Sequence, residues 1–371
     1  MTIGEIIRAI ESMVPAQYQE SWDNTGLQVG SPLSECTGVL ICVDVTDAVI
    51  NEAVSLGANL IVSHHPLIFK GLKRLTGATR VEAVVINAIG AGISIYSCHT
   101  SVDSVSGGVS WRMAGMLGVT PMSVLSPMEP RWAKVAVMVP TAHADEVRMA
   151  MFEAGAGEAG SYDCCSYNVE GMGTFRALAG ANPYVGAQDE LHHEPEVKIE
   201  SIVPRWLVGR VTAAIREVHP YECPAIDVIN LANEDSSLGL GVVGNLETPL
   251  TAGEFMSRVA GTFDSPAIRH SVVKDEDAKI RRVAMCGGSG GEFIRDAIKA
   301  HAQVYLSSDI RYHDFVDYGD EILLVDIGHF ESEQCTKDIF YEIITQKFAN
   351  FAVYKSTVEH NPMHYFTEHK A

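Results

Sequence analysis

The chain has 371 residues, and 47% of them are hydrophobic, which is enough to bury a sizeable core in two or three domains. Its 27 Lys and Arg residues against 47 Asp and Glu residues give a net charge of −20. General nucleic-acid binding is therefore not expected, because an acidic surface repels a phosphate backbone, although a bound metal ion could still attract an anionic small molecule.

The N-terminal residues, MTIGEIIRAIESMVP, predict a short amphipathic helix rather than a signal peptide, because the isoleucines at 3, 6, 7 and 10 fall on one side. No uncharged apolar run reaches the roughly 18 residues that a membrane span needs. The eight cysteines are scattered and form no C-x-x-C motif. We therefore expect a cytoplasmic protein in a reducing compartment, with most cysteines serving as small core residues.

The first third of the chain alternates predicted strands and helices. Short runs that are apolar at nearly every position indicate strands covered on both faces, and segments that begin at a capping residue and end at glycine indicate helices. This rhythm predicts a largely parallel sheet. The strands are expected at 38–45, 58–66 and 93–103, the last running into a loop, and the helices at 46–57, 80–92 and 108–119.

The last third repeats this rhythm, and we predict that it joins the first third in one discontinuous α/β domain formed by residues 1–130 and 232–371. Between these parts, three prolines in VLSPMEPRWAKVAVMVP lie around the start of a new pattern of the form β-α-β-β-α-β. Its size and order suit a ferredoxin-like module. We therefore predict that residues 131–231 are a second domain, inserted into an exposed loop of the larger one.

The segment NLIVSHHPLIF places His64 and His65 directly after a predicted buried strand. In parallel α/β sheets, ligands gather beyond the carboxyl ends of the strands. Pro66 restricts the backbone of His65, and two neighbours on an extended backbone point apart, so the pair could reach two metal ions, or one ion and a substrate. Ordinary hydrogen bonds of polar residues at a strand end are the alternative.

Two further strand ends favour the metal site. His99 and Asp103 follow the third strand, and His329 and Glu333 follow the last strand at i, i+4 spacing, which puts both on one face of a helix. Imidazoles mixed with carboxylates suit Zn²⁺, Mn²⁺ or Fe²⁺ better than Mg²⁺ or Ca²⁺. The predicted ligands of two divalent ions are His64, His65, Asp103, His329 and Glu333.

Other motifs support weaker hypotheses. The stretch CGGSGG at 286–291 could hold an anion or could be a tight turn between a strand and a helix. Asp309, Arg311 and His313 could orient the ligands or act as acid and base, or could form a surface turn. The loop around Trp22, Asp23 and Asn24 could rim the pocket. The segment LHHEPE at 191–196 is interpreted as an exposed loop of the inserted module.

Several of these motifs resemble, in order, those of the GTP cyclohydrolase 1 type 2 homologues, also called the Nif-three-like family. The resemblance covers both outer thirds of the chain and implies the Nif-three-like α/β fold with a dinuclear metal site on the five residues named above. The family's glycine stretch usually carries an arginine, where this chain has Val242 in GLGVVG. The matching segments are SWDNTGLQVG, VSHHPLIF, SCHTSVDSVSGG, CGGSGGEFIRDAI, SSDIRYHDF and DIGHFESE.

The middle module resembles the closing segment of CutA-like and PII-like ferredoxin folds through VHPYECPAIDV at 218–228. This resemblance implies a CutA/PII-like insert, trimer contacts through it, and a toroidal homohexamer. His219, Tyr221 and Glu222 could bind a ligand there, or could pack at a trimer interface.

Two functions follow from these predictions. In the first, two divalent ions activate water for hydrolysis of a nucleotide or a related phosphorylated compound, and His99 or His313 relays a proton. His64, Asp103 and Glu333 would hold one ion, and His65, His329 and Glu333 the other. In the second, the protein is a non-enzymatic metal-binding or regulatory assembly whose inserted domain senses a small molecule. Open coordination positions that face a cavity would favour the first.

Overall fold

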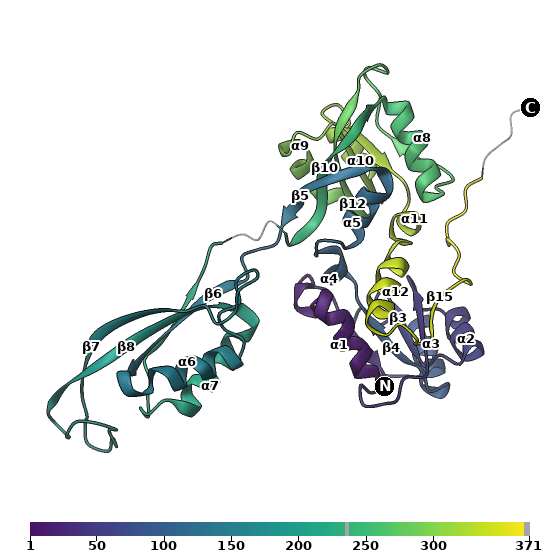
Figure 1. Cartoon of the computed structure of the whole chain (residues 1–371). Coiled ribbons are helices and arrows are strands. Elements are labelled where there is room, and N and C mark those ends of the chain that lie inside the picture. The colour runs from purple at the N-terminus through teal and green to yellow at the C-terminus, as the bar shows by residue number, and fades with distance from the viewer. Residues whose placement is uncertain (234–236, 367–371) are drawn as a thin grey trace, which may run out of the picture. The chain divides into compact units, whose positions relative to one another are not determined.

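The computed structural model describes residues 1–233 and 237–366, which form two compact α/β units (Figure 1). Unit 1 comprises residues 1–127 and 236–371, and unit 2 comprises residues 128–235. Within the described part of the chain, no helix is long and apolar enough to cross a membrane.

The first sheet of unit 1 has the strand order β1-β4-β3-β2-β15. Strands β2, β3, β4 and β15 run parallel, and β1 pairs antiparallel with β4 at the edge. The predicted strands and helices of the first third are therefore confirmed, except that the expected loop after β4 contains a helical turn, α4. The elements are α1 (Ile3–Met13), η1 (Ala16–Tyr18), β1 (Gly26–Val29), β2 (Val39–Cys42), α2 (Asp47–Leu56), β3 (Leu60–Ser63), α3 (Arg80–Gly90), β4 (Ser94–Ser97), α4 (Thr100–Asp103) and α5 (Val109–Leu117).

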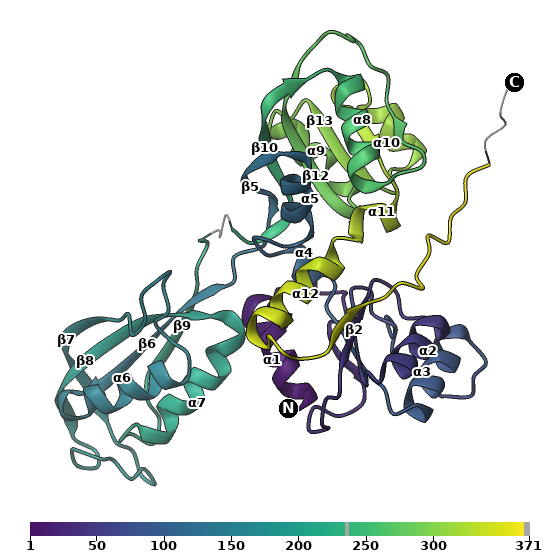
Figure 2. The ribbon, with the colours of Figure 1, turned by 45° about the vertical axis from the view of Figure 1, so that its right-hand side comes forward.

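Local sequence explains where these helices begin and end. The side chains of Thr46 and Thr79 accept hydrogen bonds from the backbone N–H groups of the first turns of α2 and α3. Gly57 ends α2 in the left-handed conformation, with φ of 69°, which glycine adopts at little cost. The two helices lie side by side (Figure 2). They cover one face of the first sheet and leave the carboxyl ends of its strands free for a site.

The second sheet of unit 1 has the order β11-β14-β13-β12-β10-β5. Its middle strands β12, β13 and β14 are parallel, whereas β10 is antiparallel to both of its neighbours. The predicted largely parallel sheet therefore describes only part of unit 1, because the second sheet contains both parallel and antiparallel strands. The elements are β5 (Val119–Pro127), β10 (Gly239–Leu250), α8 (Ala252–Phe263), β11 (Arg269–His270), β12 (Ile280–Ser289), η4 (Gly291–Phe293), α9 (Ile294–Lys299), β13 (Val304–Ser308), α10 (Tyr312–Tyr318), β14 (Leu323–Asp326), α11 (His329–Glu333), α12 (Thr336–Lys347) and β15 (Val353–Lys355).

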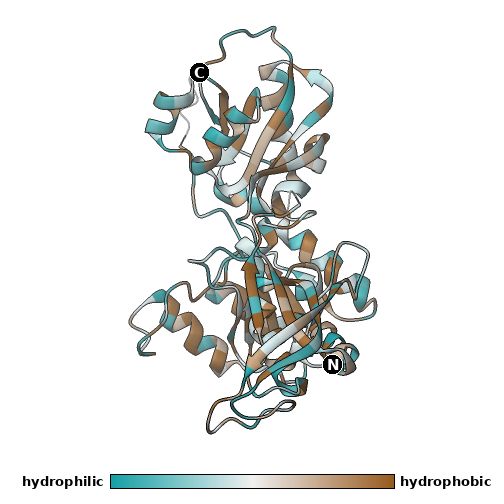
Figure 3. Ribbon diagram, turned by 90° about the vertical axis from the view of Figure 1, so that its left-hand side faces the viewer, coloured by the Kyte–Doolittle hydropathy of each residue, from teal (hydrophilic) through white to brown (hydrophobic). Residues whose placement is uncertain are grey.

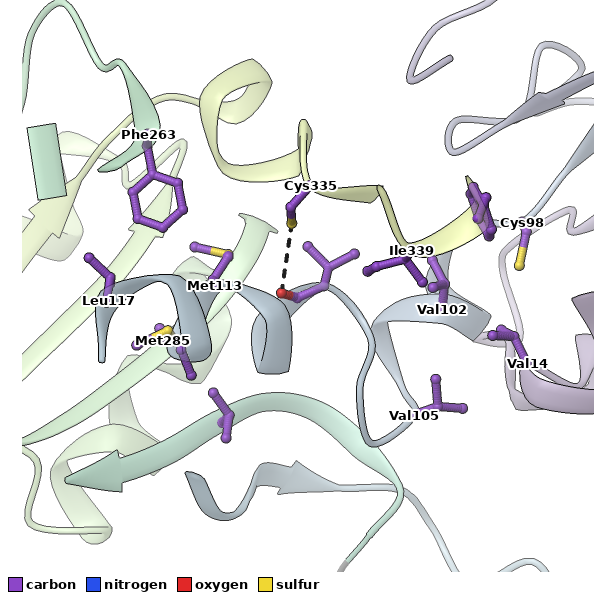
Figure 4. Close-up of a cluster of buried hydrophobic side chains, with 14 of the residues drawn as sticks. Val14, Cys98, Val102, Val105, Met113, Leu117, Phe263, Met285, Cys335 and Ile339 are labelled. Carbon is purple, nitrogen blue, oxygen red and sulfur yellow. Dashed lines mark hydrogen bonds between the residues drawn. The ribbon is translucent and has the colours of Figure 1, made fainter. Parts of the chain in front are cut away.

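One hydrophobic cluster contains residues of both sheets of unit 1 and of the helices α5 and α12. Figure 4 shows part of it, with Met113 and Met285 on one side and Val102 and Ile339 on the other. The buried thiol of Cys335 lies 4.0 Å from the carbonyl oxygen of Val109 in its middle. All eight cysteines are free thiols, and most of them are buried, as the sequence predicted.

Unit 2 is built on an antiparallel sheet of order β7-β8-β6-β9. Helices α6 and α7 pack together against one face of this sheet, and alternate residues of β6 and β8 meet them in a separate core (Figure 1). In Figure 3 brown hydrophobic stretches lie on both strands and helices, next to teal and white stretches of the same elements. The elements are β6 (Trp132–Pro140), η2 (Thr141–His143), α6 (Ala144–Glu153), β7 (Tyr167–Arg176), β8 (Leu191–Pro204), η3 (Arg205–Leu207), α7 (Val208–Val218) and β9 (Ile226–Asn230).

The prediction of an exposed loop at 191–196 was wrong, because these residues form the first part of β8. They pair with β7 over the whole stretch from Leu191, opposite Arg176, to Glu196, opposite Gly171. The hairpin therefore extends beyond the unit's core. Residues 191–196 are nearly all polar, so they show neither the apolar run nor the apolar–polar alternation by which a strand is usually recognised.

Candidate metal centre

His64 and His65 extend the ladder of the first sheet beyond β3. Their backbone N–H groups donate to the carbonyl oxygens of Cys42 and Val43, at 3.1 and 2.9 Å. Alternation along this extended backbone separates the two side chains, yet their ring centroids remain 4.9 Å apart. His64 is fully buried, whereas the side chain of His65 is 23% exposed. The pair thus lines one wall of a site at the edge of the sheet.

Glu333 lies opposite this pair and contacts three imidazoles. Its Oε1 is 3.5 Å from Nε2 of His64, and its Oε2 is 3.0 Å from Nε2 of His65. One helical turn away on α11, Nε2 of His329 is 3.1 Å from the same Oε2. The spacing of His329 and Glu333 predicted this shared face. Segments that are far apart in the sequence therefore place their ring nitrogens around one carboxylate.

The outer nitrogens of these rings are already occupied. Nδ1 of His65 lies 3.0 Å from the carboxylate of Asp44, and Nδ1 of His329 lies 2.7 Å from that of Asp309. Nδ1 of His64 lies 3.3 Å from the carbonyl oxygen of Cys98. Because carboxylate and carbonyl oxygens only accept, each Nδ1 donates. Nε2 of each ring is therefore the atom available to a metal ion, as in many metal sites where a carboxylate orients a histidine.

Asp44 was not among the predicted site residues. It follows β2, the strand next to β3, and so lies at the same sheet edge as His65. The signal that could have found it is GVLICVDV, which places an acidic residue just beyond a buried parallel strand.

The ring nitrogens of His65 and His329 that face Glu333 need a positive charge, either protons or a metal ion. Nε2 of His65 and Nε2 of His329 are only 3.3 Å apart, and both face Glu333. Burial alone would lower the pKa of each ring, but the hydrogen bonds to Asp44 and Asp309, together with the Glu333 carboxylate, raise the pKa of both histidines to about 10. Without metal the rings therefore hold protons, and a metal ion would replace these protons.

Glu333 is an anion in this setting. Its side chain is only 4% exposed, and burial raises its pKa, but the neighbouring imidazoles, His64 first, hold that pKa well below the usual value. Nε2 of His64 and Oε2 of Glu333 are buried and have no aligned hydrogen-bond partner. Buried polar atoms without partners are rare in folded proteins and often mark the place of an ion. The donor set therefore fits a divalent metal.

Two groups of potential ligands bring their atoms within 4.8 Å of one another: His65, His329 and Glu333 form one, and His64, His65 and His99 the other. The first matches one predicted ion site. Asp103, the remaining predicted ligand, belongs to neither group. Burial raises the pKa of Asp103, and its carboxyl interacts electrostatically with His64, His99 and Glu333. It therefore lies beside the cluster, at the end of α4.

His99 is held by Asp23 from the loop that the sequence analysis placed at the rim. Its Nδ1 lies 2.9 Å from Oδ1 of Asp23, while Oδ2 accepts the backbone N–H of Thr100 at 3.0 Å. Burial raises the pKa of Asp23, but the His99 contact outweighs it and the pKa falls to about 2. Trp22 packs edge-on against His99 with ring centroids 5.9 Å apart. These contacts of Asp23 and Trp22 with His99 support the prediction that this loop rims the pocket.

The structure does not bring His313 into this cluster. It is exposed on α10, and its ring packs against Tyr312. Arg311 caps the same helix through Asp314, as a surface turn would. Of the three residues noted in SSDIRYHDF, only Asp309 reaches the metal-binding side chains, through His329.

The glycine stretch CGGSGG packs closely against Glu333. Gly288 has φ of +64°, and a Cβ there would overlap Oε1 of Glu333. Gly288 therefore allows close packing against Glu333, as the tight-turn alternative for this stretch implies. Val242 is fully buried in β10 between Val124 and Met285, in a position where an arginine would bury its charge.

Comparison with known proteins identifies the family of this chain. A family model described as Duf34/NIF3 (NGG1p interacting factor 3) matches residues 1–362. The chain belongs to the NIF3 family. This confirms the resemblance seen in the outer-third motifs.

Relatives and a solved structure match the chain over nearly its full length. A Halalkalibacterium halodurans protein named GTP cyclohydrolase 1 type 2 homolog is 37% identical over 96% of this chain and 97% of its own. A Staphylococcus epidermidis protein of the same name is 32% identical over 98% and 100%. The crystal structure of a Bacillus cereus protein related to NIF3 is 36% identical, covers 99% of both chains and has a TM-score of 0.78. The NIF3 fold therefore extends over both units.

Proposed function

We propose that this NIF3-family chain is a hydrolase that depends on two divalent metal ions and acts on a nucleotide or a related phosphorylated compound. The observation that carries the proposal is the pair of Nε2 atoms of His65 and His329, 3.3 Å apart over the carboxylate of Glu333. Zn²⁺, Mn²⁺ and Fe²⁺ are the ions that match imidazole and carboxylate donors.

His65, His329 and Glu333 would hold one ion, and His64, Asp103 and Glu333 the other, so that the Glu333 carboxylate spans both. Asp44 and Asp309 orient the rings of the exposed side of the site. Ions held there would supply Lewis acidity and a nucleophile at neutral pH.

His99 is the residue that we assign to proton transfer. Asp23 fixes its Nδ1, and its ligand atom lies within 4.8 Å of those of His64 and His65. A ring held in this way can accept or return a proton at Nε2 without rotating. His313, the other histidine considered for this role, is exposed on α10 and contacts Tyr312.

The exposure of the cluster favours catalysis over a purely structural or delivery role. His64 and Glu333 are buried, but the side chains of His65 and His329 are 23% and 31% exposed. The site is therefore open on the side of these two rings, where a substrate could reach it. A saturated structural site would be closed.

Hydrolysis by metal-loaded protein tests this proposal, with GTP first in the panel because of the name that the relatives carry. Wild type is expected to turn over at least one nucleotide, and His64→Ala and Glu333→Gln to lose about 100-fold or more of that rate. His193→Ala is the matched control, because His193 belongs to the other adjacent pair and is exposed in unit 2. Equal rates in all four proteins would contradict the proposal. Bound metal without turnover would favour the non-enzymatic alternative.

We further propose that residues 131–231 are an inserted CutA/PII-like domain and that trimer contacts through it assemble a toroidal homohexamer. The element order of unit 2 and its helices on one face of an antiparallel sheet support a ferredoxin-like module. Light scattering should give six times the chain mass of 40.2 kDa. A monomeric mass would contradict the assembly and leave the metal proposal intact.

A further inference from the structure

A cavity of about 400 Å³ lies in unit 2, on the side of the β7–β8 hairpin that faces away from α6 and α7. Its lining residues come from the β7–β8 hairpin, whose course Figure 1 shows, from the loop at 177–184 and from the turn at 221–225. This volume falls in the range of pockets that hold small molecules. The side chains that define its chemistry are Met138, Phe175, Tyr184, Glu196, Tyr221 and Glu222.

Glu196 is held in one position on this floor. The hydroxyl of Tyr221 donates to its Oε1 at 2.8 Å. Gly173 lies beneath its carboxylate, and a Cβ at Gly173 would overlap Oε2. Burial, and then the contact with Glu196, raise the pKa of Tyr221, so its hydroxyl stays a donor. The carboxyl group of Glu196 therefore has a fixed orientation.

Aromatic rings cluster around Tyr221, the partner of this carboxylate. The ring centroids of Phe175 and Tyr184 lie 5.7 and 6.4 Å from that of Tyr221. The hydroxyl of Tyr184 lies 2.9 Å from Nε2 of His143, and the backbone N–H of Asn182 donates to Glu222 at 3.0 Å. These contacts hold the 177–187 loop over the cavity.

The sign of the charge decides the class of ligand. Among the described residues that line the cavity, the charged ones are Glu196 and Glu222, both acidic. Nearby Glu194 is paired with His192 at 2.8 Å. Lys198, on the same strand, is paired with Glu200 instead. An anion such as a phosphate or carboxylate would therefore meet repulsion, whereas a cation would meet a carboxylate and the negative faces of aromatic rings.

We propose that this cavity binds a protonated organic amine with an apolar body. The ammonium group donates to the carboxylate of Glu196, and the apolar part packs against Phe175, Tyr184 and Met138. The amine is recognised by unit 2 alone, so the inference does not depend on the metal site or on hydrolysis.

Isothermal titration calorimetry of the full chain tests the charge requirement with three probes of similar shape: 2-phenylethylammonium, neutral 2-phenylethanol and anionic 3-phenylpropionate. The ammonium compound is expected to bind at least ten times more tightly than either of the others, because a charge-assisted hydrogen bond is stronger than a neutral one. Equal affinity for the neutral or the anionic probe, or no binding of any probe, would overturn the proposal.

Variants locate the binding. Glu196→Gln keeps the shape and removes the charge, and is expected to weaken ammonium binding at least tenfold. Tyr221→Phe removes only the hydroxyl that fixes Glu196 and is expected to cost about threefold, which provides a second test if Glu196→Gln does not fold. Glu200→Gln is the matched control on the same strand, since its carboxylate is paired with Lys134 and Lys198. Unchanged affinity in the first two variants, or an equal loss in the control, would overturn the assignment.

Discussion

Both units carry adjacent histidines and a glutamate lying over a glycine, yet they differ in which atoms remain free. In unit 1, Nδ1 of His65 is bound to Asp44 and its Nε2 faces a buried carboxylate. In unit 2, Nε2 of His192 is already paired with Glu194, and β-strand alternation turns His193 to the other face. The comparison teaches that a histidine pair indicates a metal site only when the backbone and the outer partners leave the inner nitrogens free.

The largest effect is expected from Glu333→Gln. This change removes the one carboxylate shared by three imidazoles, and we expect the content of bound divalent metal to fall to background, a loss of more than about 100-fold in affinity. Glu194→Gln makes the same chemical change beside the histidine pair of unit 2 and should leave metal content at the wild-type level. Elemental analysis of both variants, purified without added metal, checks the difference. Metal retained by Glu333→Gln, or lost by Glu194→Gln, would break the comparison.

A smaller effect is expected from Asp309→Asn and Asp44→Asn. Each leaves the ligand in place and weakens only the contact that orients its Nδ1, so metal affinity should fall by about 10- to 100-fold. Competition with a fluorescent chelator measures this change. Asp145→Asn, an exposed acidic residue on α6 of unit 2, is the control. Affinity equal to wild type in both site variants would show that the outer carboxylates have no part in binding.

Gly288→Ala and Gly173→Ala separate the two regions by their ligands. An added Cβ would displace Glu333 in the first and Glu196 in the second. Only Gly288 has a positive φ, so its substitution should also destabilise the fold by about 1–3 kcal/mol. Metal binding should weaken in Gly288→Ala alone, and binding of 2-phenylethylammonium in Gly173→Ala alone. Thermal unfolding measures the expected change in stability, and titrations with metal and with 2-phenylethylammonium measure the two binding affinities. Loss of both ligands in either variant would contradict the prediction.

The smallest effect concerns a helix end in unit 1. Glu254 forms a capping box with Thr251, and the backbone N–H of Thr251, followed by Lys279, lowers the pKa of Glu254 to about 2. Because the folded pKa lies below the unfolded one, the stabilisation is present above the unfolded value and is lost as pH falls through about 2. Glu254→Gln should therefore lower the melting temperature slightly at pH 7 and less at pH 3. A difference that grows on acidification would contradict this.

Much of unit 1 was predictable because its buried strands and capped helices carry strong local signals, as Thr46 and Gly57 do for α2. His64 and His65 at the end of β3 were predictable as candidate ligands because ligands gather beyond strand ends, and His329 and Glu333 because i, i+4 residues share a helical face. Strand order does not explain why the two pairs meet, since β3 and β14 belong to different sheets. Asp44 was missed because a single acidic residue after a strand is common. The first part of β8 was misjudged because its hydrogen bonds to β7 decide its structure, and sequence composition does not reveal such pairing. The cavity of unit 2 is lined by Tyr221 and Glu222, which the sequence analysis named as possible ligand-binding residues, but its remaining walls come from segments that no motif connects to them.

Anomalous diffraction from crystals grown with Mn²⁺ or Zn²⁺ tests the central claim most directly. The account predicts two metal peaks, each about 2.0–2.3 Å from its ligand atoms, with Glu333 touching both, His65 and His329 on one ion, and His64 and Asp103 on the other. No peak at this site, or a peak bound only by residues outside it, would contradict the account.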